Sequence, residues 1–432
     1  MKINPARSPL TRRAFLRMLA TAGGGALLGA CGLAAPVPPT ATPQPVAITI
    51  WNWLDDALTT LIADFEAQQS AVTVRAERMG YEAAHRQLLQ ALERGSGAPD
   101  VFITDRGMLG VLREQPGLAD LAAAPFDGLR FKADLLGWAW DAASFEGRLT
   151  AMPWNVGVGA AWYRADTLAA AGLPTEPAAL AAQAQRWDDW QSLDQELRRQ
   201  RPGSELIAES LRLFAPAVAQ QGGGWFDGGR LRVAERAGPA AELIAGLARR
   251  DIPADLPGSQ YGPRMVDGTI AGFIDASWMQ LFIQRDFPTT AGQWRLIRPP
   301  GGDFSLSSLA MLIPAQSQQQ EAAWQFVTTL CTTVAAQNLT FQSSGALPAY
   351  MPAWNDPIYD QGVPFFGDQP AYRVLVEAAA AQPSITLSRY DTQIDAIVGM
   401  AAGRIARGTE EPAAALAAAE EQIRRQFPDL AA

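Results

Sequence analysis

Strand-like and helix-like segments alternate along the chain from residue 46 onward, and this alternation limits the possible folds more than any other feature. β-Branched and aromatic runs predict the first strands at 47–53, 72–77 and 100–104, and apolar residues at helical spacing predict the first helices at 55–69 and 81–94. Strands that alternate with helices predict an α/β fold with a largely parallel sheet. Ligands of such sheets bind at the carboxyl ends of the strands.

The alternation continues toward the C-terminus. Further strands are expected at 149–154, 157–163, 205–208, 269–275, 294–297 and 309–313, and further helices at 164–171, 188–201, 212–221 and 318–336. Glu410, Glu411 and Pro412 suit the first turn of a last helix, because acids and proline are favoured there. At 432 residues, of which 48% are hydrophobic, the chain is long enough for two domains.

Residues 1–30 have the order of an export signal. Basic residues without any acid precede a mildly apolar stretch at 18–28, and small residues then lead to Cys31. The apolar stretch is too short to span a bilayer. Residues 11–17 (TRRAFLR) resemble a twin-arginine export motif, with an ordinary basic segment of the general export route as the alternative. Residues 28–31 (LGAC) resemble a bacterial lipobox, in which Cys31 becomes the lipidated first residue.

Residues 31–45 are expected to form a lipidated tether. The sequence after Cys31 reads GLAAPVPPTATPQP, and this proline content favours extended polyproline II over a packed core. Together with the lipobox, the tether predicts a folded body held outside the cytoplasmic membrane. We expect the membrane to be contacted through the lipid anchor only.

Charge and composition exclude several classes of function. Removing the five basic residues of the export signal from the 35 in the chain leaves 30 against 44 acidic residues. This excess of acidic residues makes the folded body poorly suited to binding nucleic acid. His85 is the only histidine, and Cys331 is the only cysteine besides Cys31, so we expect no metal site, no cofactor and no internal disulfide. Cys331 lies in an apolar stripe of helical spacing, which predicts a buried structural thiol.

Six segments, in this order, resemble the family 1 extracellular solute-binding proteins, the sugar-binding components of ABC importers. They are ITIWNWLDDALTTLIADFEAQQSAVTV (48–74), LLQALERGSGAPDVFITD (88–105), AMPWNVGVGAAWYRADTLAAAGLP (151–174), MVDGTIAGFIDASWM (265–279), LAMLIPAQSQQQEAAWQFVTTLCT (309–332) and SSGALPAYMPAW (343–354). The resemblance covers nearly the whole mature chain. The sequence departs from the family at Arg164, where asparagine is usual, and at 186–188.

The resemblance implies two lobes joined by crossing strands, with a ligand in the cleft between them and closure by hinge bending. Lobe 1 is expected to comprise residues 46–152 and 305–345, and lobe 2 residues 153–304 and 346–432. The expected partners are a sugar and the subunits of an ABC permease. We expect a monomer that binds its ligand and catalyses no reaction.

A sugar offers hydroxyl groups around its ring and C–H groups on its two faces, so a binding site needs aromatic rings together with carboxylates or amides. The chain has 13 tryptophans, and several stand beside Asp, Asn or Gly where predicted elements end. The predicted ligand-binding residues are Trp53, Asp55, Tyr81, Asp105, Trp154, Asn155, Trp225, Asp275, Trp278 and Ser307. The alternatives are burial in the core for the tryptophans, helix capping for Asp105 and a hydrophobic staple for Tyr81.

Two other functions remain open from the sequence. A secreted glycoside hydrolase would use paired carboxylates, although no hydrolase motif accompanies the acids of this chain. A binding protein for a non-sugar solute, such as a polyamine or a glycerol phosphate, would have the same fold. A phosphate ligand would favour arginine or a helix N-terminus in the cleft.

Overall fold

The computed structural model describes residues 45–54, 57–227 and 229–428. The predicted export signal, Cys31, the tether up to residue 44 and Asp55 lie outside the described residues.

The strands are β1 (Val46–Asn52), β2 (Val72–Arg78), β3 (Val101–Asp105), β6 (Met152–Arg164), β9 (Gly272–Ala276), β10 (Trp294–Ile297), β11 (Ser305–Leu312) and β12 (Leu347–Pro348), with two small hairpins, β4 (Ser144–Phe145) with β5 (Arg148–Leu149) and β7 (Phe226–Asp227) with β8 (Arg230–Leu231). The helices that precede β6 are α2 (Ala57–Gln68), α3 (Tyr81–Arg94), α4 (Arg106–Leu112) and α5 (Gly137–Ala143). Helices and strands together confirm the predicted α/β class.

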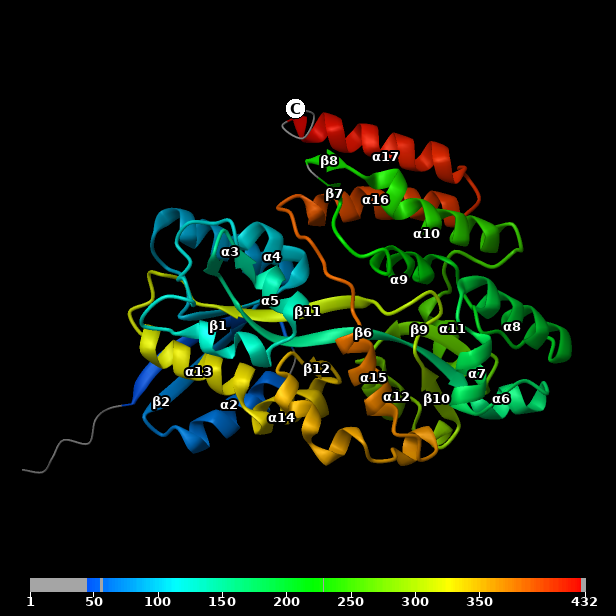
Figure 1. Cartoon of the computed structure of the whole chain (residues 1–432), viewed down its shortest axis with the longest axis horizontal. Helices are drawn as coiled ribbons and strands as arrows, with labels where there is room; N and C mark the ends of the chain where they lie inside the picture. The colour runs from blue at the N-terminus through cyan, green and yellow to red at the C-terminus, as the bar shows by residue number, and fades with distance from the viewer. Residues whose placement is uncertain (1–44, 55–56, 228, 429–432) are drawn as a thin grey trace, which may run out of the picture. The chain divides into compact units, whose positions relative to one another are not determined.

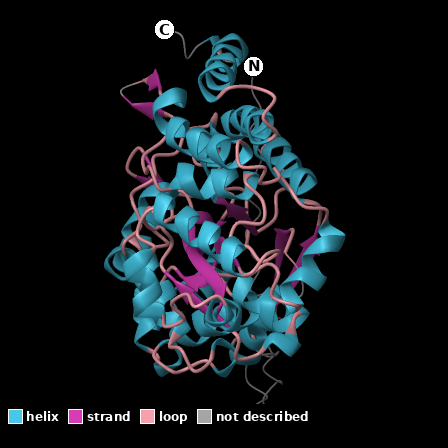
Figure 2. Ribbon diagram, turned by 90° about the vertical axis from the view of Figure 1, so that its right-hand side faces the viewer, coloured by secondary structure: helices cyan, strands magenta, loops and turns pink. Residues whose placement is uncertain are grey.

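The remaining helices follow β6. They are α6 (Ala165–Ala170), α7 (Pro177–Gln183), α8 (Trp187–Gln200), α9 (Phe214–Ala219), α10 (Val233–Ala248), α11 (Gly258–Val266), α12 (Met279–Asp286), α13 (Gln320–Thr332), α14 (Val334–Ser344), α15 (Ala371–Ala380), α16 (Asp391–Ala406) and α17 (Pro412–Gln426). Among the described residues, no helix combines the length and the apolar character needed to span a membrane. Helices surround most of the strands, which occupy the interior, although one short strand pair lies at the periphery (Figure 2).

The main sheet has the strand order β10-β6-β11-β3-β1-β2, and β9 and β12 also pair with β6. Only the pairs of β1 with β2 and with β3 are parallel, whereas β11 and β6 run antiparallel to their neighbours. The prediction of a largely parallel sheet is therefore right for β2-β1-β3 and wrong for the rest. The β-α-β connections that produce parallel pairing are confined to the N-terminal region, and β11 enters that sheet from the opposite direction.

Strand β6 links the two parts of the sheet. Its first half pairs with β11 and its second half with β9 and β10, and all of its residues are buried (Figure 1). The sequence predicted two strands here, with Pro153 between them. Instead, Pro153 lies inside β6 opposite Ala310, next to a register shift between Leu309 and Ala310. A proline is tolerated at such a bulge because the regular ladder hydrogen bond is already missing.

The buried apolar side chains form two clusters. One surrounds β1, β3 and β11 with α2, α3 and α13, and the other lies among α8, α10, α16 and α17. Successive side chains of β6 contribute to different clusters: Trp162 to the first, Ala161 and Tyr163 to the second. This follows from the two-residue period of a strand, which turns neighbouring side chains to opposite faces.

Other expectations have mixed outcomes. Cys331 is buried in α13 as predicted, and burial raises the pKa of its thiol. The helix predicted at 318–336 is two helices, because Thr333 leaves the helical conformation and its Oγ1 accepts a hydrogen bond from the Ala336 amide. The strand predicted at 205–208 is reduced to a single bridge between Glu205 and Ile270.

Arg164, the departure from the family pattern, has a structural role. Its buried guanidinium forms an ion pair with Asp166, with Nη2 and Oδ2 2.7 Å apart. It also donates a 2.7 Å hydrogen bond to the carbonyl oxygen of Met265. Arg164 therefore ties the end of β6 to the end of α11.

Candidate functional site

Four of the predicted ligand-binding residues line one cavity of about 570 Å³, which we call the Trp278 cavity. They are Trp154 and Asn155 from β6, Ser307 from β11, and Trp278, which directly precedes α12. Its other lining residues are Leu54, Leu61, Arg78, Leu281, Phe282, Arg285, Leu309, Thr340, Ser343, Ser344 and Ala346. The cavity thus gathers an indole, an amide and hydroxyl groups from segments far apart in the sequence.

Trp278 is positioned by glycines. A Cβ atom at position 157 would lie 2.1 Å from Cζ3 of Trp278, and one at position 345 would lie 2.9 Å from its Cα. These distances are shorter than any carbon contact allows, so the indole lies directly against the β6 backbone at Gly157. The indole remains half-buried, which leaves part of it available to a ligand.

Trp154 and Asn155 contribute differently to the Trp278 cavity. Trp154 is 2% exposed, and its Nε1 donates a 3.3 Å hydrogen bond to Oγ1 of Thr340. Asn155 is also 2% exposed, although its residue lines the cavity wall. Ser307 is half-buried. Trp278 and Ser307 are therefore the more accessible members of this group.

Trp53, Tyr81 and Asp105 lie together elsewhere, at the carboxyl ends of β1 and β3. The Tyr81 hydroxyl donates a 2.9 Å hydrogen bond to Oδ1 of Asp105, and the Tyr81 ring meets the Trp53 ring edge to face at 5.1 Å. Oδ1 of Asp105 also accepts a hydrogen bond from the Met108 amide at 3.0 Å, which caps α4. Burial and the nearby Asp105 raise the pKa of Tyr81. The capping alternative for Asp105 is therefore observed.

Asp275 is engaged inside the protein. It is 7% exposed, and its Oδ2 accepts a 2.8 Å hydrogen bond from Nη1 of Arg212, which also pairs with Glu209. Burial raises the pKa of Asp275, although the positive charge of Arg212 acts to lower it. Asp275 lies on β9, three residues before Trp278, so its ion pair anchors the strand that leads to that indole.

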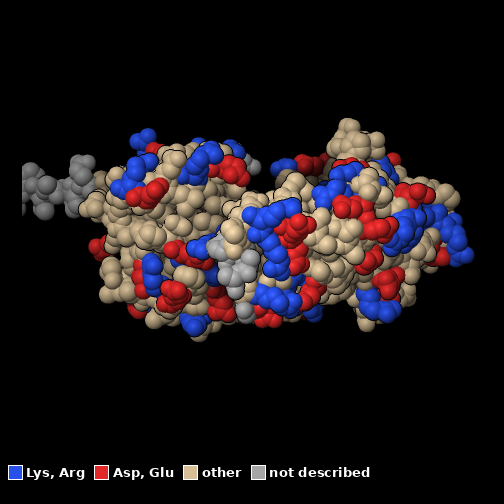
Figure 3. Space-filling model, turned by 90° about the horizontal axis from the view of Figure 1, so that it is seen from above, with Lys and Arg blue, Asp and Glu red and all other residues tan. Residues whose placement is uncertain are grey.

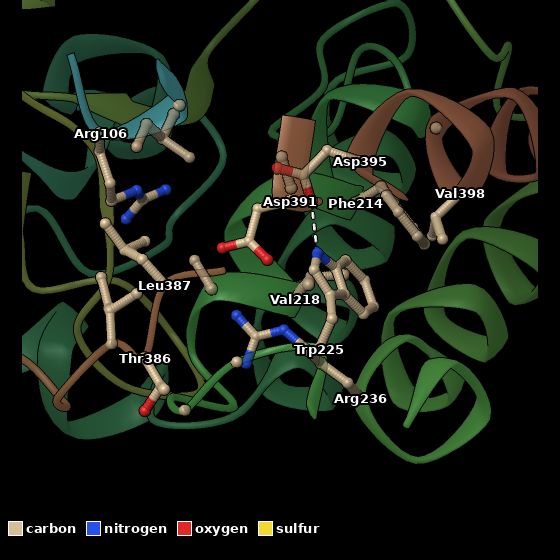
Figure 4. A pocket seen from close by; sticks show the side chains of 18 residues that line it. Arg106, Phe214, Val218, Trp225, Arg236, Thr386, Leu387, Asp391, Asp395 and Val398 are labelled. Atoms are coloured by element: carbon tan, nitrogen blue, oxygen red, sulfur yellow. Dashed lines mark hydrogen bonds between the residues drawn. The ribbon is translucent and has the colours of Figure 1, made fainter. Parts of the chain in front are cut away.

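Trp225 belongs to a second cavity of about 310 Å³, which we call the Asp395 cavity (Figure 4). Trp225 is 4% exposed, its Nε1 donates a 2.8 Å hydrogen bond to Oδ1 of Asp395, and the Arg236 guanidinium lies 5.2 Å from its ring centre. Arg106 and Asp391 also line this cavity. Strand β11 contributes to both cavities, through Leu306 here and through Ser307 and Leu309 at the Trp278 cavity.

Sequence reasoning missed the charged residues of the Asp395 cavity. Most of the predicted residues follow strands or precede helices of lobe 1 and the crossover, whereas Asp391 and Asp395 lie in the first turns of α16, in the C-terminal helical region. Their spacing of four residues places both carboxylates on one face of that helix, and this was the available signal. Arg106 directly follows the predicted Asp105, but the sugar interpretation favoured aromatic rings, carboxylates, amides and hydroxyls over guanidinium groups.

Two observations bear on other kinds of site. Within the described residues, no group of three or more His, Cys, Asp or Glu side chains has the arrangement to hold a metal ion. On the face shown in Figure 3, acidic and basic side chains are interspersed. That face therefore offers no basic stripe of the kind that follows a nucleic-acid backbone.

Comparisons with known proteins agree with this architecture. Residues 51–337 match the family described as bacterial extracellular solute-binding protein. This chain belongs to that family. Its members are binding proteins, and the family places the chain outside the cytoplasm. The family and its two-lobed α/β fold, both predicted from the sequence, are thereby confirmed.

Individual relatives are distant. The chain is 23% identical over 391 residues to a lactose-binding protein of Rhizobium radiobacter, covering 84% of this chain and 89% of the relative. A solved family 1 extracellular solute-binding protein superposes with a TM-score of 0.77 at 21% identity, over 88% of this chain and 99% of that chain.

A binding protein of B. animalis subsp. lactis, solved with β-1,6-galactobiose, has a TM-score of 0.70 at 19% identity, over 89% of this chain and 98% of that one. The galacto-N-biose/lacto-N-biose I-binding protein of Bifidobacterium longum has a TM-score of 0.72 at 16% identity, over 90% of this chain and 98% of that one. These likenesses establish the fold that the family shares.

Proposed function

We propose that this protein binds a sugar or short oligosaccharide and delivers it to the permease of an ABC importer. The observation that carries the proposal is the Trp278 cavity, where a half-buried indole lies beside the Asn155 amide and the Ser307 hydroxyl. An indole face suits the C–H face of a sugar ring, and amide and hydroxyl groups suit its hydroxyls. Relatives that bind lactose, galactobiose and lacto-N-biose support the same ligand class.

Within this proposal, Trp278 stacks on the sugar, and Asn155 and Ser307 form hydrogen bonds with its hydroxyls. Trp53, Tyr81 and Asp105 form a rim in lobe 1. Asp275 acts by anchoring β9 through its ion pair with Arg212, and Trp225 acts by holding Asp395 through a hydrogen bond. Each sugar hydroxyl buried without a partner would cost about 1–3 kcal/mol, which is the source of selectivity.

The two lobes are proposed to comprise residues 46–152 with 305–345, and 153–304 with 346–432. Strands β6 and β11 pair with each other across the proposed boundary between the lobes and would act as the hinge. Closure around the ligand would produce the form that the permease recognises, with the binding protein acting as a monomer.

We further propose that Cys31 carries a lipid that anchors the protein to the outer face of the cytoplasmic membrane after twin-arginine export. The experiment is Cys31→Ser, followed by fractionation of the cells. The variant should leave the membrane fraction, and continued membrane association would contradict the lipid anchor.

The function is tested with a thermal-shift panel that contains lactose, maltose, β-1,6-galactobiose, lacto-N-biose, spermidine and glycerol 3-phosphate. We expect one or more of the saccharides to raise Tm, because a ligand that binds only the folded state stabilises it. Calorimetric titration then compares the wild type with Trp278→Ala, which should lose most of its affinity while remaining folded. A response to spermidine or glycerol 3-phosphate alone would replace the sugar with that solute, and cleavage of a saccharide would show an enzyme.

A further inference from the structure

His85, the only histidine of the chain, lies at the centre of an aromatic cluster. It is on α3, one turn after Tyr81, and is 2% exposed. The centre of its ring lies 4.4 Å from the ring centre of Tyr81, 4.7 Å from that of Trp53 and 5.1 Å from that of Phe102. At these separations aromatic rings are in direct contact. His85 therefore packs against side chains from α3, β3 and the end of β1.

Hydrogen bonds at both ring nitrogens fix the orientation of the imidazole. Nδ1 lies 2.8 Å from the Tyr81 carbonyl oxygen, and because a carbonyl oxygen only accepts, Nδ1 carries a proton. Nε2 lies 3.4 Å from Oγ1 of Thr104, whose hydroxyl donates to the neutral ring. Burial lowers the pKa of His85, although the Tyr81 hydrogen bond and the charges of Asp105 and Glu82 act to raise it. The imidazole is therefore neutral at pH 7 and protonated on Nδ1.

Trp53 depends on this cluster for its position. Within the part of the chain that the structure describes, its indole forms no hydrogen bond. Its ring contacts are with His85 at 4.7 Å, with Tyr81 at 5.1 Å and with Phe102 at 6.2 Å, so His85 is the nearest of the three. Trp53 is half-buried and directly precedes Leu54, which lines the Trp278 cavity. A shift of the indole would therefore also move a wall of that cavity.

The pair of Tyr81 and Asp105 supports a second wall. A Cβ atom at Gly107 would lie 3.6 Å from the Tyr81 hydroxyl oxygen and 3.4 Å from Oδ1 of Asp105, so both side chains pack against that glycine. Gly107 lines the Asp395 cavity. Since His85 contacts the rings of both Tyr81 and Trp53, one buried side chain lies behind walls of both cavities.

Packing alone does not account for a polar side chain at this position. An apolar side chain of similar size would fill the same space without the cost of burying an imidazole. The imidazole differs because its two hydrogen bonds hold the plane of the ring, and satisfied buried networks specify one arrangement of their neighbours. The plane of the His85 ring in turn limits where the rings of Trp53 and Tyr81 can lie.

We propose that His85 is a positioning residue of the sugar site, which holds the Trp53 indole and the Tyr81 ring through an imidazole fixed by two hydrogen bonds, without touching the ligand. The proposal rests on the proposed function, in which Trp53, Tyr81 and Asp105 form a rim in lobe 1. Residues that contact a ligand bind it well only when a second layer of side chains locks their rotamers.

The first experiment measures affinity by calorimetric titration with the saccharide that raises Tm most in the panel above. His85→Ala should lower affinity at least about tenfold, because Trp53 loses its nearest ring contact. Leu92→Ala is the matched control, since it removes a buried side chain about two turns further along the same helix. That control should lose stability and keep the wild-type affinity.

A double-mutant cycle distinguishes positioning from a general structural role. If His85 acts through Trp53, the combined variant His85→Ala with Trp53→Ala should lose at least about threefold less affinity than the product of the two single losses. Calorimetric titration of the four proteins measures this. Losses that multiply without any such shortfall would mean that His85 does not act through the indole, and would overturn the proposal.

A second variant covers the case in which His85→Ala does not fold. His85→Phe keeps a ring of similar size without the two hydrogen bonds, and it should lose at least about threefold in affinity if they fix the rim. Wild-type affinity in His85→Phe would overturn the proposal.

Nuclear magnetic resonance reads the wild type directly, because without a histidine tag His85 gives the only imidazole signals. The nitrogen shifts should show the proton on Nδ1, and saturating saccharide should shift the ring signals as Trp53 and Tyr81 meet the ligand. A proton on Nε2, or signals unchanged at saturation, would overturn the positioning role. Failure of every saccharide on wild type would overturn the proposed function instead.

Discussion

Trp278 reaches its position in the cavity because the residue beneath it has no side chain. A Cβ atom at position 157 would lie 2.1 Å from Cζ3 of the indole and 3.0 Å from Oγ of Ser307. The neighbouring Gly159 serves Phe304 in the same way, since a Cβ there would lie 2.2 Å from that ring. Glycines in a strand interior often mark a close approach by another group, which explains why β6 retains them despite their cost to the strand.

Gly157→Ala should displace the indole without removing it. We expect sugar affinity to fall at least tenfold, which is about 1.4 kcal/mol. The free energy of unfolding should fall by about 1–3 kcal/mol, the usual cost of overpacking. Titration and chemical denaturation measure the two effects. Gly137→Ala is the control, because a Cβ atom there meets nothing within 4 Å. Wild-type affinity in Gly157→Ala would show that the position of the indole is unimportant for binding.

Asp395 should lower stability only slightly at neutral pH, because the residue is exposed and solvent partly screens its charge. Burial raises the pKa of Asp395 in the folded protein, although the Trp225 hydrogen bond and the charges of Arg106 and Arg236 act to lower it. Burial also raises the pKa of the neighbouring Asp391. The folded state thus holds this proton more tightly than the unfolded chain. The resulting stability is fully present below the unfolded pKa, about 3.9, and is lost as the pH rises through the folded pKa.

Asp395→Asn should therefore raise Tm at pH 7, where the native carboxyl is charged. The increase should largely disappear at about pH 3, where the native carboxyl is protonated in both states. Thermal unfolding of the wild type and the variant at both pH values measures this. A lower Tm of Asp395→Asn at pH 7 would mean that the charge stabilises the fold, contrary to the direction of the pKa shift.

At the scale of elements, the segment before α16 is docked onto α4. A Cβ atom at Gly110 would lie 2.3 Å from the Ser388 carbonyl oxygen, so the two backbones are in close contact. Oγ1 of Thr392 donates a 2.6 Å hydrogen bond to the Gly107 carbonyl oxygen. Arg113 donates a hydrogen bond to the Leu387 carbonyl oxygen. These contacts join a helix of the N-terminal sheet region to the helix that carries Asp391 and Asp395. Two of the residues in these contacts, Gly107 and Leu387, line the Asp395 cavity.

Gly110→Val should push this segment away from α4. The backbone of Ser388 cannot rotate aside as a side chain would, so we expect a loss of about 1–3 kcal/mol in the free energy of unfolding. Hydrogen exchange should accelerate at the start of α16. Gly246→Val, at an open helical position, controls for the effect of valine in a helix. Unaltered exchange at α16 in Gly110→Val would mean that the docking does not order that helix.

Elements with strong local signals were predictable, and elements that depend on distant partners were not. Helix α3 was predicted with its full bounds, since Gly95 ends it in the left-handed conformation (φ 69°). The continuity of β6 was missed because Pro153 breaks strands locally and only its pairing with β11 shows the bulge that accommodates it. The grouping of Trp278, Asn155 and Ser307 followed from the resemblance, whereas the Asp395 cavity needs the packing of α4, α10 and α16, which no local pattern specifies.

At the scale of the described body, β6 and β11 are the only main-sheet strands with a partner on each side of the proposed lobe boundary. β6 pairs with β11 and β12 along one half and with β9 and β10 along the other, and β11 pairs with both β3 and β6. Bending two adjacent strands requires small backbone changes at few residues, and the register shifts in β11 mark where the ladder is already irregular. Hinge motion is therefore expected there.

If the lobes close on a sugar through this hinge, ligand should make the protein more compact. We expect the radius of gyration from small-angle X-ray scattering to fall when the binding saccharide is added to the wild type. Trp278→Ala at the same sugar concentration should keep the unliganded radius, because it forms little complex. The radii with and without sugar differ only if the ligand binds the closed form more tightly than the open form. A ligand with equal affinity for both forms would not shift the equilibrium between them. A saccharide that binds in calorimetry and leaves the radius unchanged would show a rigid site between fixed lobes.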